Sequence, residues 1–477
     1  MRLTVLALGS IAVSFISCAT PGVGSSGARE GATAYYLQEN GASTREFSAQ
    51  RVEPSSSSKH ERQGVTQTRQ AVLGALHEVT RSTTSLTRSL HLLKPSEHNL
   101  EGRVTNAFTH HVAYGAGQLP WLNGALSGAT RLAQASSEVD DLDMERSMLR
   151  MTGPRLQAAM FGSTLLAIWV DFLNLADLVL RQSRYYSAER LVVDMHRVQQ
   201  LIEPSMQALG SLEPGQIETA VASMPALMGK LTREFNSLRE AVRLAAQRGG
   251  QVMMAAQLIE TLTLVSAMKL SLPRLSPTAP ATLGGDLLMG SHGVMMGSRL
   301  VVSAEWVEQM RRLVQAGVLS VPAVSAAVRI QAGQALMSQA HQELPQGVRE
   351  ALGDGPEVRA MHETGKAGAG MAEPPQHHVL PKEHREWFEK RGFVGEMSID
   401  QFCVELELAH HQAIHGGGNW RLGRTWPREW NQMIMSVLRD AETAAGRILT
   451  RNQTLKIVAR YMRNYDIPMS FTPWRGR

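Results

Sequence analysis

The 477-residue chain has little of what would define several common protein classes. It has only two cysteines, Cys18 and Cys403, which lie far apart, so a disulfide scaffold is excluded. Charged residues make up 19% of the chain and hydrophobic residues 43%, which excludes a wholly disordered protein. No convincing run alternates polar with apolar residues. The low aromatic content, 5%, and the 24 methionines instead predict helix-packed interiors in a mainly α, multidomain chain.

The N-terminal residues predict export. Residues 1–17, MRLTVLALGSIAVSFIS, place one basic residue before an apolar run that is too short for a stable membrane span. This is the order of a secretory signal peptide. The last residues before Cys18 resemble a lipobox, with Phe15 where Leu is typical, and so predict lipidation of Cys18 and a membrane anchor. The alternative is an ordinary signal peptide in which Cys18 is incidental.

The composition then predicts a flexible tether followed by a helical body. Residues 18–63 are rich in Gly, Ser, Thr and Ala and cannot bury enough apolar surface to fold. From Val65, apolar residues recur every seven positions and predict an amphipathic helix that Pro95 stops. Helical periodicity returns over 155–185, 215–245, 250–271, 303–316 and 322–343. We therefore expect an α-helical carrier body over residues 64–343.

Three features of this body allow more than one interpretation. Leu156 to Val170 contains no charged residue, but it is short for a membrane span and favours a buried core helix. The Gly/Met-rich stretch from Gly284 to Gly297 predicts a loop rather than a membrane-active segment. The doublet His110-His111 has no second histidine cluster in the following eighty or so residues, which indicates a structural role.

Proline and glycine residues over 344–375 predict a linker before a C-terminal domain, residues 376–477. Within that domain, Gln376–Leu380 predicts a short strand ended by Pro381, and Lys382–Lys390 a short helix. A second helix is expected over Glu407–His415, ended by three glycines. Six of the sixteen histidines lie between 377 and 415: His377, His378, His384, His410, His411 and His415.

The histidine spacing points to a metal site. His411 and His415 are four residues apart, so on a helix they project from one face with their Cβ atoms about 6 Å apart. Two such imidazoles can share a divalent ion, and a third ligand from the strand would leave a position open for water or phosphate. Gln412 stands where a zincin protease has its glutamate, which argues against a peptidase. His384 and His410 are expected to be helix-face residues rather than ligands. The alternative is that His410 replaces one of the ligands in a different helix register.

Five motifs then carry a family resemblance. In order they are HHVLPKE, RGF, IDQFCVEL, HHQAIHGGGNW and WPREWN. Together they resemble the C-terminal domains of myxobacterial polymorphic-toxin lipoproteins, the outer-membrane-exchange toxins. Those domains are similar to the HNH/endonuclease VII (ββα-metal) nuclease group. The nuclease resemblance covers roughly residues 376–440, and the lipoprotein layout covers the whole chain.

The resemblance implies a role for four of these histidines. His377, His411 and His415 would bind one divalent metal ion, Zn or Mg, and His378 would be the general base. One departure from the HNH pattern concerns the Asn that orients the base, because no Asn lies between His378 and His411. Asp400 and Asn419 remain candidates for that role.

Charge separates within the C-terminal domain. Residues 377–420 carry four Lys/Arg against seven Asp/Glu, whereas residues 421–477 carry eleven against four. A basic face beside a metal site favours a nucleic-acid substrate, and a solvated basic helix is the alternative. The candidate contacts are Arg421, Arg424, Arg428, Arg451 and Arg460. Trp426, Trp430 and Trp474 are expected in the core rather than as base-stacking platforms.

These features together predict an exported lipoprotein toxin with a helical carrier and a small α+β, HNH-like nuclease domain that cleaves DNA rather than RNA. The resemblance also implies an outer-membrane location in the producer, action in the recipient cytoplasm, and a cognate immunity protein as partner. The alternative is a non-enzymatic envelope lipoprotein with a structural metal site or none.

Overall fold

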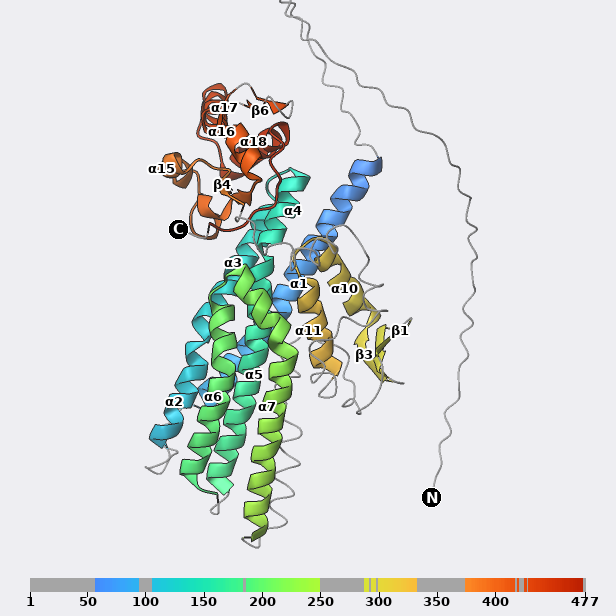
Figure 1. Cartoon of the computed structure of the whole chain (residues 1–477), viewed down its shortest axis with the longest axis vertical. Helices are drawn as coiled ribbons and strands as arrows, with labels where there is room; N and C mark the ends of the chain where they lie inside the picture. Colours follow the sequence, from blue (N-terminus) through green and yellow to red (C-terminus); the bar gives the residue numbers. More distant parts are fainter. Residues whose placement is uncertain are drawn as a thin grey trace, which may run out of the picture. The chain divides into compact units, whose positions relative to one another are not determined.

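Helices build the body of the chain, as the apolar periodicity predicts (Figure 1). The computed structural model describes residues 56–93, 105–182, 186–248, 287–290, 293–296, 299–332, 374–416, 418–419, 424–426 and 428–474. All of these lie within residues 54–477, which form one unit. The predicted signal peptide with Cys18, the predicted helix 250–271 and nearly all of the predicted linker 344–375 lie outside the described residues.

The predicted helices largely correspond to helices of the structure. The described helices of the body are α1 Ser56–Leu92, α2 Thr105–Gly117, α3 Leu119–Ser136, α4 Leu142–Met151, α5 Gly153–Gln182, α6 Ala188–Gly210, α7 Pro214–Arg248, α10 Ala304–Gln315 and α11 Val321–Ala332. The ranges 155–185, 215–245 and 303–316 match α5, α7 and α10. Helix α11 covers the first half of 322–343, and most of the second half lies outside the described residues.

The start of α1 corrects the predicted tether over residues 18–63. The helix begins at Ser56, shortly after Pro54, so the C-terminal end of the predicted tether is helical. Residues 59–64 of this first part are all exposed, whereas Val65 is buried. Apolar periodicity therefore begins only where the helix meets the core, which is why the sequence pattern places its start too late.

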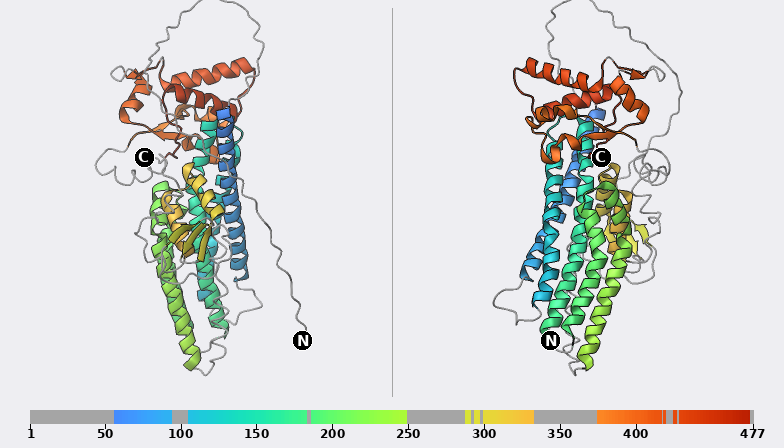
Figure 2. Two further views of the ribbon diagram at one scale, coloured as in Figure 1. Left: turned by 90° about the vertical axis from the view of Figure 1, so that its right-hand side faces the viewer. Right: turned by 60° about the vertical axis from the view of Figure 1, so that its left-hand side comes forward.

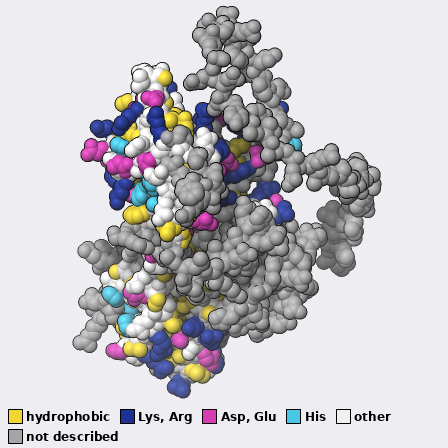
Figure 3. All heavy atoms as spheres, turned by 45° about the horizontal axis from the view of Figure 1, so that its top comes forward, with side chains coloured by type: hydrophobic (Ala, Val, Ile, Leu, Met, Phe, Trp, Pro, Cys, Tyr) yellow, Lys and Arg dark blue, Asp and Glu magenta, His cyan; other side chains and the backbone are white. Residues whose placement is uncertain are grey.

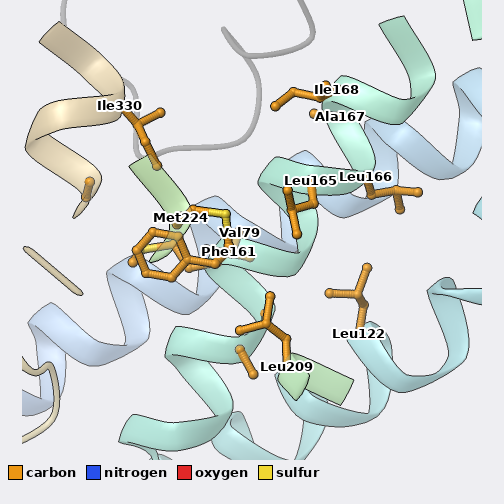
Figure 4. Close-up of a cluster of buried hydrophobic side chains, with 14 of the residues drawn as sticks. Val79, Leu122, Phe161, Leu165, Leu166, Ala167, Ile168, Leu209, Met224 and Ile330 are labelled. Carbon is orange, nitrogen blue, oxygen red and sulfur yellow. The ribbon is translucent and has the colours of Figure 1, made fainter. Parts of the chain in front are cut away.

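Helix α5 is the central core element of the body. Figure 4 shows Phe161 and Leu165 of α5 among side chains from its neighbours, including Val79 of α1, Leu122 of α3 and Met224 of α7. Among the described residues, one helical stretch, Leu142–Asp177, is long and apolar enough to cross a membrane by length and composition, which is weak evidence for a span. Because 94% of its apolar window is buried inside the fold, the stretch behaves as a core helix.

The prediction of a loop from Gly284 to Gly297 is wrong for most of that stretch, because β1 Leu287–Gly290 and β2 Gly293–Met296 lie within it. With β3 Arg299–Ser303 they form an antiparallel sheet in the order β1-β2-β3. Gly290 pairs with Gly293 beside a two-residue connection, the spacing of a tight hairpin. Strands β2 and β3 contact α10, β3 also contacts α11, and the sheet is drawn in yellow in Figure 2. Methionine and glycine are poor indicators of strands, so the sequence pattern does not reveal them.

The C-terminal region is a small α+β assembly (Figure 1). Its elements are β4 Gln376–His378, the 3-10 turn η1 Lys382–His384, α15 Arg385–Glu389, η2 Gly395–Met397, η3 Ile399–Gln401, β5 Cys403–Glu405, α16 Leu408–Gly416, β6 Gly418–Asn419, β7 Arg424–Thr425, α17 Trp430–Ala445 and α18 Arg451–Asn464. Strands β4 and β5 pair antiparallel, with His377 opposite Val404. The predicted short strand, short helix and histidine-bearing helix are thus all present.

The core of the C-terminal region is shared with the helical body. Its buried residues include Phe388, Phe402 and Trp430, and they cluster with Leu132 of α3 and Met144 of α4. The residues after α18 contact β5 and η3. Thr472 forms a β-bridge with Cys403 of β5, and the backbone N–H of Trp474 donates to the Asp400 carbonyl at 2.7 Å. The C-terminal region therefore buries part of its apolar surface against α3 and α4 rather than only against itself.

Ion pairs reinforce this contact. The residues Glu138 to Asp143, here called the acidic segment, run from the end of α3 into the first turn of α4. They pair with basic residues spread along α18 from its first turn to its last. Lys456 donates to Asp140 at 2.6 Å, and Arg463 donates to Asp141 at 3.0 Å. Arg451 lies 3.7 Å from Glu138. The ion pairs join charges more than three hundred positions apart in sequence.

Candidate metal centre

Strand β4 and helix α16 bring three histidines together. Because α16 is helical from Leu408 to Gly416, His411 and His415 project from one face, and that face packs against His377 of β4. Each ring offers one nitrogen, and these nitrogens all lie within 4.8 Å of one another. The three residues could hold a metal ion.

The cluster is buried on its strand side and open on its helix side. His377 is 3% exposed, whereas 33% of the His415 side chain is exposed. Burial, followed by the neighbouring His415 and His411, lowers the pKa of His377 to about 2, and burial also lowers the pKa of His411. Both rings are therefore neutral at physiological pH, which is the form that binds a metal ion.

One distance within the cluster matches the spacing of two ligands of a divalent ion. Nε2 of His415 and Nδ1 of His377 are 3.2 Å apart, close to the spacing of two nitrogens in one coordination sphere. Nε2 of His377 is buried and has no hydrogen-bond partner within the described residues. An unpaired buried ring nitrogen is costly, and such groups often mark a functional site.

Glu429 fixes the orientation of His415. Its Oε1 atom accepts a hydrogen bond from Nδ1 of His415 at 2.7 Å, so Nε2 of the same ring is directed to the cluster. The other carboxylate oxygen caps α17 by accepting from the backbone N–H of Gln432 at 2.9 Å. A carboxylate behind a histidine fixes its tautomer and raises its basicity as a ligand.

His378 lies on the other face of β4, because successive side chains of a strand point to opposite sides. Its Nε2 atom is 3.1 Å from Oδ1 of Asp400, and its ring centroid is 4.7 Å from that of Trp474. Arg385 donates two hydrogen bonds to the same carboxylate, both at 2.8 Å. These contacts, with the hydrogen bond from Arg385 first and the one from His378 after it, lower the pKa of Asp400 to about 2.

The remaining histidines of the C-terminal region lie outside the cluster. His410 is hydrogen-bonded to the Tyr465 carbonyl at 3.0 Å and stacks against Trp426. His384 is half-buried at the start of α15. In the helical body, His111 is buried with Nδ1 3.3 Å from Gln199, as expected for a structural residue, whereas His110 of the same doublet is exposed.

The candidate nucleic-acid contacts are dispersed. Arg421 lies outside the described residues, and Arg424 lies on β7 with its side chain not described. Arg428 and Arg460 are exposed, whereas Arg451 is half-buried and paired with Glu138. Lys/Arg and Asp/Glu side chains lie interspersed over the described part of the face drawn in Figure 3. Trp430 is fully buried, as expected, while Trp426 and Trp474 are half-buried.

Three residues around the histidines make contacts that local sequence patterns do not predict. Glu429 follows His415 by fourteen positions, and Asp400 follows His378 by twenty-two. Arg385 lies fifteen positions before Asp400. Of the two candidates for orienting His378, Asp400 contacts it, while Asn419 lies on β6 with its side chain not described.

Comparison of the chain with protein-family models, with curated proteins and with solved structures found no match.

Proposed function

We propose that the chain is an exported lipoprotein toxin whose C-terminal region, residues 376–477, is a metal-dependent endonuclease of the ββα-metal, HNH-like type. The observation that carries this proposal is the histidine cluster on a strand–strand–helix unit. In chain order, β4 supplies His377, β5 pairs with it, and α16 supplies His411 and His415. The adjacent His378 stands apart from the cluster and is held by Asp400.

The donor set favours a particular class of ion. Three imidazole nitrogens suit Zn²⁺ or another borderline transition metal, whereas Mg²⁺ prefers oxygen ligands. When bound, such an ion would supply charge that neutralises a phosphate and its leaving oxygen. Three protein ligands leave a position for that phosphate or for water.

Residues of the chain would bind the metal ion, accept a proton from water and contact the DNA backbone. His377, His411 and His415 would hold the ion, and Glu429 would keep His415 in the tautomer that presents Nε2. His378 would take a proton from the attacking water, since a neutral imidazole is a base near physiological pH. Exposed Arg428 and Arg460 would contribute sequence-independent phosphate contacts to DNA.

A lipid on Cys18 would anchor the chain at the outer membrane of the producer, the helical body would carry the toxic region, and a cognate immunity protein would protect kin.

The second candidate function is a non-enzymatic envelope lipoprotein with a structural metal. One observation favours it: Arg451, Lys456 and Arg463 of α18 are paired with the acidic segment and are not free to bind phosphate.

Incubation of the purified full chain with plasmid DNA and with RNA separates the two candidates. We expect cleavage of DNA with added Zn²⁺ or Mn²⁺, none with EDTA, and none by His411→Ala. The matched control is His384→Ala, which removes a histidine of the same region that lies outside the cluster. Retention of metal without cleavage of either nucleic acid would favour the non-enzymatic protein.

A further inference from the structure

A cavity of about 480 Å³ lies in the helical body where α1, α4 and α10 meet (Figure 1). Residues of all three helices line it, and none of the lining residues belongs to the C-terminal region. The cavity is therefore separate from the histidine cluster. Most of the side chains around it are polar or charged, which sets it apart from the apolar core that the same helices share.

Three half-buried arginines line this cavity, Arg146 and Arg150 of α4 and Arg312 of α10. Glu308 is the one carboxylate among the described residues that line it. That carboxylate already accepts from Arg312 at 3.0 Å and pairs with Arg311, which does not line the cavity. The lining residues therefore carry an excess of positive charge. Such an excess is unfavourable for half-buried groups unless an anion offsets it.

The fold holds two of these arginines in place. Nε of Arg150 donates to the backbone carbonyl of Ala316 at 3.0 Å, and Nε of Arg312 donates to Glu308. Gly317, with φ +70°, leaves room for the first contact, because a Cβ there would lie 3.2 Å from Nε of Arg150. Guanidinium groups that are already fixed lose less conformational entropy when they bind an anion.

Further donors at the cavity are not committed to hydrogen bonds. The ion pairs of Arg146 with Asp143 and Glu61 are 3.6 and 3.8 Å long, beyond hydrogen-bond distance, and both carboxylates are about half exposed. The side-chain amides of Gln67 and Gln315, which also line the cavity, form no hydrogen bond to another described residue. These groups can turn toward a ligand without breaking a hydrogen bond of the fold.

We propose that this cavity binds a small phosphate monoester. Its volume lies in the range of small-molecule sites, about 300–1,000 Å³, which excludes a nucleic acid or a protein domain as the occupant. Guanidinium groups pair with phosphate oxygens through two parallel hydrogen bonds, and a phosphate monoester carries a charge of about −1.5 to −2 at neutral pH. Buried Val65 and Leu149 provide an apolar wall for the carbon part of the ester. The proposal is independent of the nuclease.

Thermal melting of the full chain with glycerol 3-phosphate tests the site. The chain is first stripped of metal, so that phosphate cannot bind through an ion at the histidine cluster. Glycerol 3-phosphate should raise the melting temperature above that in sodium chloride of equal ionic strength, because a ligand that binds only the folded chain stabilises it. Malonate, a dicarboxylate of similar charge, should raise it less. An equal rise with malonate would overturn the assignment to phosphate.

Arginine variants locate the binding. Arg146→Gln with Arg312→Gln should lose the rise in melting temperature. The matched control is Arg197→Gln with Arg243→Gln, which also removes two arginines paired with carboxylates of their own helices, but on α6 and α7. The control should keep the full rise, and an equal rise in both double variants would overturn the proposal. If the first pair does not fold, Arg146→Gln alone decides, since its long ion pairs add little stability. It should weaken binding about tenfold.

Flotation with vesicles distinguishes a soluble ester from a lipid headgroup. The full chain carrying Cys18→Ser, which has no lipid of its own, is mixed with phosphatidylcholine vesicles with or without phosphatidic acid, whose headgroup is also a phosphate monoester. Flotation that requires phosphatidic acid and is lost in Arg146→Gln with Arg312→Gln would identify the lipid as the source. A rise in melting temperature without flotation would identify a soluble ester. Neither response in the wild-type cavity would overturn the proposal.

Discussion

Glu429 shows how a single carboxylate can serve both the fold and the site. One of its oxygens orients His415 and the other caps α17, so the C-terminal end of the histidine-bearing helix α16 is tied to the start of α17. The histidine cluster is thereby coupled to a rigid element rather than to a free loop.

If the histidine cluster binds a metal ion, its affinity should depend on Glu429. Glu429→Gln should weaken binding of Zn²⁺ to the full chain about 10–100-fold, because the partner behind a ligating histidine sets its orientation and basicity. Competition with a chromophoric chelator measures this change. Thr450→Ala is the matched control: it removes the N-cap of α18, costs about 1 kcal/mol of stability and should leave metal affinity intact. Equal losses in both variants would contradict the account.

Substitutions of the individual histidines should differ in their effects on cleavage and on metal binding. His378→Ala should abolish cleavage, a loss of about 10²–10⁴-fold, while leaving metal affinity nearly intact. His411→Ala and His415→Ala should lose both, because two ligands are too few to retain the ion. Metal analysis beside a cleavage assay makes the comparison. If His384→Ala is as damaging as His411→Ala, the assignment of roles is wrong.

Asp400 also makes stability depend on pH in the acid range. The pKa of Asp400 in the folded chain, about 2, lies below the ordinary value of about 3.9. Ionised Asp400 therefore stabilises the folded chain in full at a pH above about 3.9. The contribution is lost as the pH falls through the folded pKa. The difference in melting temperature between wild type and Asp400→Asn should therefore be constant above about pH 4 and shrink toward pH 2. A difference that grows on acidification would be the opposite result.

At the scale of elements, ion pairs join α18 to the acidic segment. Lys456 and Arg463 of α18 contact Asp140 and Asp141, and the hydrogen bond from Lys456 lowers the pKa of Asp140. These basic residues are part of the positive C-terminal charge that suggests a polyanionic ligand. In the described arrangement, the body itself neutralises them.

Neutralising the acidic segment should therefore strengthen nucleic-acid binding. Asp140→Asn with Asp141→Asn should raise the affinity of the full chain for DNA and steepen its salt dependence, by a slope of about 0.9 for each additional phosphate contact. Asparagine at 141 still caps α4, so the helix is kept. The control removes two exposed acidic charges on α7, Glu218→Gln with Glu240→Gln. Equal effects of both pairs would indicate only a change of net charge.

Sequence patterns predict those elements that show a regular spacing of residues along a short stretch of the chain. The seven-residue recurrence of Val65, Val72 and Val79 gives α1, and the four-residue spacing of His411 and His415 gives the shared face of α16. Contacts between distant positions have no such signal. The pairing of Lys456 with Asp140 depends on how α18 meets α4, which no local pattern encodes. The β1–β3 strands are too rich in Gly and Met to be distinguished from a loop.

At the scale of the whole molecule, the C-terminal region and the body share a core. Met144 and Met148 of α4 are fully buried in the cluster that also contains Phe402 and Leu455. The proline- and glycine-rich stretch before residue 376 predicts a boundary in the chain, but the packing continues across to α3 and α4. The stability of the C-terminal region should therefore depend on residues of the body.

Met144→Ala tests this dependence. It should cost about 2–5 kcal/mol, as for other buried large-to-small changes, and it should lower the amide-exchange protection of α18 as well as that of α4. Leu122→Ala is the matched control, since Leu122 is equally buried but belongs to the core of the helical body. It should lower protection in α3 and α5 and leave α18 protected. Loss of protection confined to α4 in Met144→Ala would show that the C-terminal region is independent.

The most direct test of the central claim is a titration of the metal-stripped full chain with Zn²⁺, in which cleavage of plasmid DNA is recorded at each step. If His377, His411 and His415 hold the ion that the nuclease needs, cleavage should rise from zero and saturate at one equivalent of metal per chain. Cleavage that is already complete without metal, or a full equivalent of bound metal with no cleavage at any point, would contradict the account.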